Sequence, residues 1–179
     1  MRNIVILVGS MRKGGNTDLL ARRFAEGAAE HNHVGIISAA DCRVSPCIGC
    51  NTCFTREDHA CFNHDDMDMI YEKLRRADVL VIASPVYFYG ISAELKAIID
   101  RLHTPMRSSF AIRKTALLLV GAASLPNLFD PILLQYQMIL DFFHLQDCGK
   151  VLVRGVKDRG DIIGHPALDE AYRLGLSIE

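Results

Sequence analysis

Three uninterrupted apolar runs constrain the fold of this chain more than any other feature of its sequence. Residues 4–8 (IVILV), 79–83 (VLVIA) and 115–120 (TALLLV) show no alternation of apolar and polar positions. A strand with this composition is buried on both faces, which is typical of a parallel sheet covered by helices. Each run ends in a loop that leads into a helical pattern, so right-handed crossover helices are expected between the strands.

Two shorter apolar segments complete the pattern, at residues 34–37 and 151–153. With 179 residues, half of them hydrophobic, the chain is long enough for one sizeable core and too short for two. We therefore predict a single α/β domain over residues 1–179. Five strands with a helix after each suit a three-layer, flavodoxin-like fold: a five-stranded parallel sheet in the order 2-1-3-4-5, with helices on both faces.

Composition excludes several classes of protein. A net charge of −1 provides no basic stripe, so nucleic acid is not an expected partner. No apolar run approaches the length of about 18 residues that a membrane-spanning helix needs, and the N-terminus enters a strand directly. We expect a cytoplasmic protein without membrane contact. Six cysteines in such a protein favour metal binding or redox chemistry over structural disulfides.

The turn at residues 9–17 (GSMRKGGNT) is the first candidate site. It is rich in hydroxyl, amide and glycine groups and leads onto a helix N-terminus, whose free N–H groups and dipole favour an anion. Arg12 and Lys13 add positive charge. The glycine spacing matches neither the dinucleotide fingerprint nor a P-loop. An ordinary strand-to-helix loop with Asn16 as the N-cap is the alternative.

Two further loops are expected at the same edge of the sheet, because the ligand crevice of this strand order lies at the carboxyl ends of strands 1 and 3. The loop at residues 84–91 offers a flat apolar surface, and the loop at residues 121–124 consists of small residues. A phosphate site beside an aromatic-rich surface suits a phosphorylated planar ligand. FMN is such a ligand.

Three segments resemble the NAD(P)H-dependent FMN reductase family: residues 9–17, residues 84–88 (SPVYF) and residues 92–101 (SAELKAIIDR). The resemblance covers residues 1–101. It implies an FMN phosphate site and a surface along the isoalloxazine ring, with NAD(P)H as the electron donor and a homodimer or homotetramer as the assembly. The phosphate contacts it implies are Ser10, Arg12, Gly15, Asn16 and Thr17; the ring contacts are Pro85, Val86, Tyr87 and Phe88; Gly90, Gly121 and Ala122 are further contacts. No acid–base residue is nominated, because the flavin carries the chemistry.

Four cysteines lie in a segment without periodicity, residues 41–64, in the pattern Cys47-x2-Cys50-x2-Cys53-x7-Cys61. This spacing resembles that of the iron-sulfur flavoproteins, a branch of the same family, and implies a [4Fe–4S] cluster on these four thiols. Tetrahedral zinc and a redox-active dithiol or disulfide are the alternatives. Cys42 and Cys148 fall outside the spacing, and we expect them to be plain thiols, with Cys148 at a helix end.

These observations predict an FMN-dependent oxidoreductase. Electrons would pass from a reduced nicotinamide or a ferredoxin through FMN to the cluster or another acceptor. An electron carrier without small-molecule turnover, and a flavin sensor with a zinc-stapled cysteine loop, are the alternatives. Arg101 and His103, at the end of a predicted helix, are candidates for a contact with the site or with a partner subunit.

Overall fold

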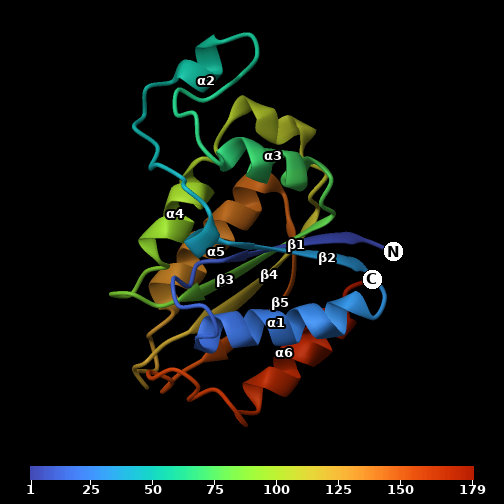
Figure 1. Ribbon diagram of the computed structural model, residues 1–179, viewed down its shortest axis with the longest axis vertical. Coiled ribbons are helices and arrows are strands. Elements are labelled where there is room, and N and C mark those ends of the chain that lie inside the picture. Colours follow the sequence, from blue (N-terminus) through green and yellow to red (C-terminus); the bar gives the residue numbers. More distant parts are fainter.

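A computed structural model describes residues 1–179 and contains five strands and six α-helices (Figure 1). The strands are β1 (Asn3–Val8), β2 (His33–Ser38), β3 (Val79–Pro85), β4 (Lys114–Val120) and β5 (Gln146–Val153). The helices are α1 (Asn16–Ala29), α2 (Thr52–Thr55), α3 (Met67–Arg75), α4 (Ala93–Asp100), α5 (Asp130–Phe143) and α6 (Ala167–Leu176). Short 3-10 helices cover Ala39–Asp41 and Pro105–Ser109.

The five strands form one parallel sheet in the order β2-β1-β3-β4-β5, which confirms the predicted topology. β1 lies between β2 and β3, with Ile4 opposite Val79 and Val8 opposite Ala83 of β3. The order of the strands reverses direction between β1 and β3. The carboxyl ends of these strands and of β4 therefore open into the same crevice.

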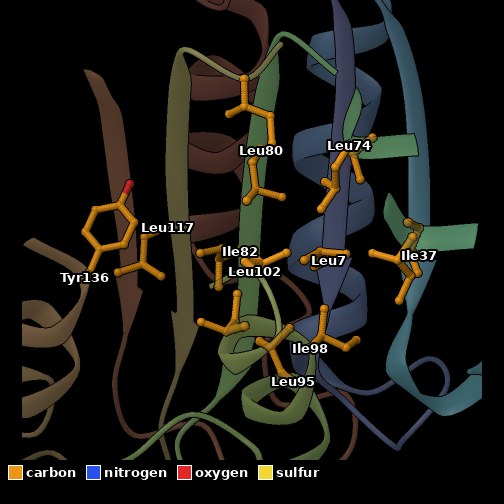
Figure 2. Close-up of a cluster of buried hydrophobic side chains, with 14 of the residues drawn as sticks. Leu7, Ile37, Leu74, Leu80, Ile82, Leu95, Ile98, Leu102, Leu117 and Tyr136 are labelled. Atoms are coloured by element: carbon orange, nitrogen blue, oxygen red, sulfur yellow. The ribbon is translucent and has the colours of Figure 1, made fainter. Parts of the chain in front are cut away.

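Two apolar cores lie on opposite faces of the sheet. Ile4, Ile6 and Val8 of β1 pack under α1 and α6, whereas Val5 and Leu7 face α3, α4 and α5. Figure 1 shows the same division of the helices between the two faces. Figure 2 shows part of the second core, in which strand residues such as Leu7 and Leu117 lie near Ile98 and Tyr136. Both faces of β1 are thus buried, as its continuous apolar run predicted.

α1 and α6 pack backbone to backbone at two glycines. A Cβ atom added to Gly27 would lie 2.0 Å from the carbonyl oxygen of Tyr172. A Cβ atom added to Gly175 would lie 2.2 Å from the carbonyl oxygen of Phe24. Neither contact leaves room for a side chain, so both positions require glycine.

The structure corrects the predicted end of the sheet. β5 begins at Gln146, not at residue 151, and Cys148 lies in this strand and not at a helix end. Residues 146–150 are polar or glycine apart from Cys148, so they carry no apolar strand pattern, but their backbone pairs with β4 at the edge of the sheet. The pairing of β4 with β5 is irregular in this part. Its register shifts between Thr115 and Leu117, and Gly149 has a positive φ of 137°.

The cysteine-containing segment, residues 41–64, projects from the end of the sheet beyond α3 (Figure 1). Within it the chain forms one short helix, α2, which the sequence pattern did not predict. The helices of the molecule include none that is both long enough and apolar enough to cross a membrane.

Candidate functional site

A cavity of about 200 Å³ lies where the loops after β1, β3, β4 and β5 meet. It gathers most of the residues that the sequence nominated for FMN, whereas Phe88, Gly90 and Gly121 do not line it. Its lining residues are Ser10, Arg12, Gly15, Asn16, Thr17, Pro85, Val86, Tyr87, Val120, Ala122, Val156 and Lys157. One end is therefore polar and cationic, and the other end is apolar.

The polar end is built on the N-terminus of α1. The first intrahelical hydrogen bond runs from the N–H of Leu19 to the carbonyl of Gly15, so the helix does not use the N–H groups of Asn16 and Thr17. These groups and the positive end of the helix dipole suit a phosphate. The alternative with Asn16 as the N-cap is wrong, since Gly15 occupies that position and makes no side-chain cap.

The side chain of Asn16 has a different partner. Its Nδ2 donates to the carbonyl of Asp158 at 2.8 Å, and its Oδ1 accepts from the N–H groups of Gly160 at 3.0 Å and Ile162 at 3.4 Å. Both ends of the carboxamide are thus used to brace the loop after β5 against the loop after β1. Only the backbone N–H of Asn16 remains available to a ligand.

The charged side chains around the polar end of the cavity differ in whether another residue already pairs with them. Asp18 is buried, and its carboxylate accepts from the N–H of Gly14 at 2.8 Å and from Nε of Arg22 at 3.1 Å. Lys13 forms an ion pair with Asp41. Arg12 and Lys157 line the cavity itself. The site therefore combines two cations with a neighbouring acid that is already neutralised, an arrangement that favours an anion.

The apolar end is carried by β3 and the turn after it. The N–H of Val86 donates to the carbonyl of Val120 at 2.8 Å, which holds this loop against β4. Tyr87 and Gly90 exchange two backbone hydrogen bonds, and between them Phe88 and Tyr89 have positive φ angles of 45° and 65°. Such a turn normally uses glycine or asparagine. Phe88 is 98% exposed, so its ring extends into solvent and not along the cavity.

Sequence reasoning missed three lining residues: Val120, Val156 and Lys157. Val156 and Lys157 lie in the loop after β5, which our prediction did not include in the site. The signal that identifies them is their position, because the carboxyl ends of all parallel strands share one edge of the sheet. Lys157 is the more important omission, since it supplies a second cation.

The cysteine loop, residues 41–64, is less organised than the cavity. All six cysteines are free; Cys47 and Cys50 are exposed, whereas Cys53 and Cys61 are half-buried. A hydrogen bond from Thr52 at 3.2 Å lowers the pKa of Cys50. Burial raises the pKa of Cys53, and the nearby thiols, Cys61 first, raise it further. No three His, Cys, Asp or Glu side chains are close enough together to hold a metal ion.

The four thiols nevertheless supply the donor set of an iron-sulfur cluster. They lie near enough to affect one another electrostatically, and no disulfide consumes them. A site of this kind is completed when its ligands close around the metal, because metal binding and local folding are coupled. Burial raises the pKa of Cys42 and Cys148, the two cysteines outside the spacing, as it does that of Cys53.

Comparison with known proteins decides the family. Residues 2–151 match the family described as NADPH-dependent FMN reductase. The chain belongs to this family. It is accordingly an FMN-dependent oxidoreductase by family, and the resemblance found in the sequence is confirmed.

Two relatives are named iron-sulfur flavoproteins, and a third is named as an oxidoreductase. An iron-sulfur flavoprotein of Methanosarcina thermophila is 33% identical over 93% of this chain and 84% of its own length. One from Methanocaldococcus jannaschii is 42% identical over 62% of this chain, and the alignment spans only 56% of that relative. A Bacillus subtilis protein named as an NAD(P)H-dependent FMN-containing oxidoreductase is 30% identical over 96% of this chain and 95% of its own length.

Solved structures confirm the flavodoxin-like fold of this FMN reductase family member. The Trp repressor binding protein from Bacillus subtilis superposes with a TM-score of 0.70 at 25% identity, over 98% of this chain and 99% of that chain. An NAD(P)H:quinone oxidoreductase from Methanothermobacter marburgensis gives a TM-score of 0.78 at 18% identity, over 98% and 96% of the two chains. The second likeness concerns the fold alone.

Proposed function

We propose that this FMN reductase family member binds FMN in the cavity between the loops after β1, β3, β4 and β5, and oxidises NAD(P)H there. The observation that carries the proposal is the pairing, in one cavity, of a cationic helix N-terminus with an apolar surface. The backbone N–H groups of Asn16 and Thr17, the hydroxyls of Ser10 and Thr17, and the side chains of Arg12 and Lys157 would bind the phosphate. Pro85, Val86 and Tyr87 would lie along the ring.

Bound FMN would accept a hydride from a reduced nicotinamide, and the chain would orient the two molecules. The cavity volume of about 200 Å³ is smaller than the roughly 300–1,000 Å³ of a typical enclosed ligand pocket. One side of the cofactor would therefore remain open to a nicotinamide or a partner. Tyr87, Phe88 and Tyr89 are exposed beside it, and their apolar area supports our proposal that a second subunit covers this edge in a homodimer or homotetramer.

The same proposal assigns a [4Fe–4S] cluster to Cys47, Cys50, Cys53 and Cys61. It is supported by their spacing, by their being free thiols, and by the names of the relatives. A bound cluster supplies one-electron chemistry. The chain would then take electron pairs from NAD(P)H, or electrons from a ferredoxin, and deliver them singly. In this scheme the acceptor is the cluster or an external molecule.

One anaerobic experiment tests both parts. The protein is purified without oxygen and its absorption spectrum is recorded before and after the addition of NADPH, with separate assays for iron, sulfide and zinc. We expect flavin bands that NADPH bleaches, and iron with sulfide in equal amounts. Colourless protein that takes up no added FMN would contradict the cofactor site. Bleaching by a reduced ferredoxin alone would favour the electron-carrier alternative, and zinc would favour the stapled loop.

A further inference from the structure

A buried arginine lies beneath the cysteine loop. Arg101 follows α4 as its C-cap residue, and only 3% of its surface is exposed. Its Nη1 donates to both carboxylate oxygens of Asp65, at 2.8 and 2.6 Å, and to the carbonyl of Ser45 at 3.2 Å. The hydroxyl of Tyr71 donates to the carbonyl of Arg101 at 2.7 Å, so the backbone of this residue is held as well.

These contacts close the cysteine loop at its base. Ser45 lies two residues before Cys47, and Asp65 lies four residues after Cys61. Asp65 also accepts from the N–H of Ser45 at 2.8 Å, so the two ends of the loop meet at the Arg101–Asp65 pair. Nη1 of Arg101, the residue that follows α4, therefore fixes the two points at which the segment with all four thiols leaves and rejoins the rest of the chain.

The remaining donors of Arg101 have no partner. Nε and Nη2 are buried, and neither makes a hydrogen bond. A buried donor without an acceptor is costly, and in a native protein it needs an explanation such as an ion that completes the site. Asp65 offers no further acceptor, because its two oxygens already accept from Nη1 of Arg101 and from the N–H groups of Ser45 and Met67. The guanidinium thus keeps unused donors and a positive charge in a region closed to water.

Cys61 of the cysteine loop lies near enough to Arg101 to act on its charge. Burial lowers the pKa of Arg101, but the hydrogen bond to Asp65 and the charge of a nearby Cys61 thiolate raise it, and the net direction is upward. Burial raises the pKa of Tyr71 to about 12, and Cys61 and Cys53 add to this rise. Arg101, Tyr71, Cys53 and Cys61 therefore share one electrostatic environment under the loop.

We propose that Arg101 is a positioning residue for the anionic group that Cys47, Cys50, Cys53 and Cys61 hold, with Nη1 closing the loop and Nε and Nη2 directed to the negative charge of that group. The inference rests on the cluster assigned under the proposed function. A cluster with four thiolates carries net negative charge, which increases on reduction. A fixed buried cation stabilises the reduced form more strongly than the oxidised form and so raises the reduction potential.

The test compares Arg101→Gln, Arg101→Lys and the wild type, each as the full chain loaded with iron and sulfide without oxygen. The readouts are the midpoint potential from an EPR-monitored redox titration and the iron retained after gel filtration. Arg101→Gln should reduce the equilibrium constant for cluster reduction about tenfold, a downward shift of about 59 mV for a one-electron couple. Arg101→Lys keeps the positive charge but lacks the planar guanidinium group. Its midpoint potential should therefore lie between those of Arg101→Gln and the wild type.

Arg56→Gln is the matched control. Arg56 lies in the same loop but is exposed and pairs with Asp58, so solvent screens its charge. Its removal should change the equilibrium constant by less than about twofold on the same physical grounds. FMN content should stay at the wild-type level in every variant, because neither arginine lines the FMN cavity.

A double variant separates the loss of the Arg101 charge from misfolding caused by an unpaired Asp65. Arg101→Gln leaves Asp65 buried without its partner, whereas Arg101→Met with Asp65→Leu removes both charges of the pair and is expected to fold. Its cluster should show a lowered potential as well, by a smaller shift than in Arg101→Gln, because the negative charge of Asp65 is removed too. A cluster with the wild-type potential and retention in the folded variants would overturn this inference alone. A wild-type chain that binds FMN but no iron would overturn the assigned cluster and this role of Arg101 together.

Discussion

The cavity proposed for FMN and the cysteine loop represent two ways of building a site in one chain. The cavity is assembled before any ligand arrives: parallel strands deliver four loops to one edge, and Asn16 and Asp18 brace the polar end with hydrogen bonds. The cysteine loop is held at its base, where Arg101 meets Asp65, and its thiols are not gathered around one point. The strands already hold in place the residues that line the cavity. The cysteine loop, in contrast, becomes ordered around its ligand when that ligand binds.

The largest expected effect follows from replacing one thiol. Cys53→Ser should abolish iron binding, because a cluster that needs four thiolates cannot be completed with three. FMN content should remain at the wild-type level, since the two sites share no residue. Iron and flavin analysis of anaerobically loaded protein measures both. Cys42→Ser is the control and should keep its iron; equal loss in both variants would mean that the spacing does not define the ligands.

A smaller effect is expected at the cationic end of the cavity. Arg12→Gln should raise the Kd for FMN about 10- to 100-fold, because a hydrogen bond to a charged group contributes about 1.5–3 kcal/mol. Fluorescence quenching of added FMN gives the Kd. Lys13→Gln is the matched control, because Lys13 pairs with Asp41 and does not line the cavity. If the two variants weakened FMN binding equally, general attraction and not the cavity would explain the affinity.

The brace between the loops after β1 and β5 is expected to matter for stability. Asn16→Ala should lower the free energy of unfolding by about 1–3 kcal/mol, since it leaves the buried backbone partners of the carboxamide unpaired. Urea denaturation measures this change. Asn63→Ala, which removes one exposed hydrogen bond to Pro46 at 3.3 Å, should cost less. A stability of Asn16→Ala equal to that of the wild type would show that the cavity is not braced by this residue.

The smallest effect concerns the aromatic turn. Phe88→Gly should raise the free energy of unfolding by up to about 1 kcal/mol, because glycine adopts the positive φ without the steric cost of a side chain. Almost no buried surface is lost, since Phe88 is 98% exposed. Phe88→Ala separates the two contributions, as it removes the ring but keeps the strained Cβ atom. Lower stability in both variants would show that the ring has a partner on the protein.

Much of this architecture was predictable from local pattern. Continuous apolar runs indicated β1, β3 and β4, and the polar turn after β1 and the aromatic-rich loop after β3 indicated the loops that line the cavity. β5 was underestimated because residues 146–150 pair through their backbone at the sheet edge, and backbone pairing leaves no trace in side-chain polarity. Lys157 was missed for a related reason: its contribution depends on which loop lies beside the helix N-terminus and not on its own neighbours in sequence.

The amino-acid sequence alone determined the strand pattern, the family resemblance and the set of four cysteines, because burial on both faces of a strand and ligand spacing are properties of short segments. The tertiary structure decided that the side chain of Asn16 braces a distant loop, that Phe88 points into solvent, and that Arg101 lies buried under the cysteines with two unused nitrogens. The physical reason is that hydrogen-bond partners and burial arise between segments far apart in the chain.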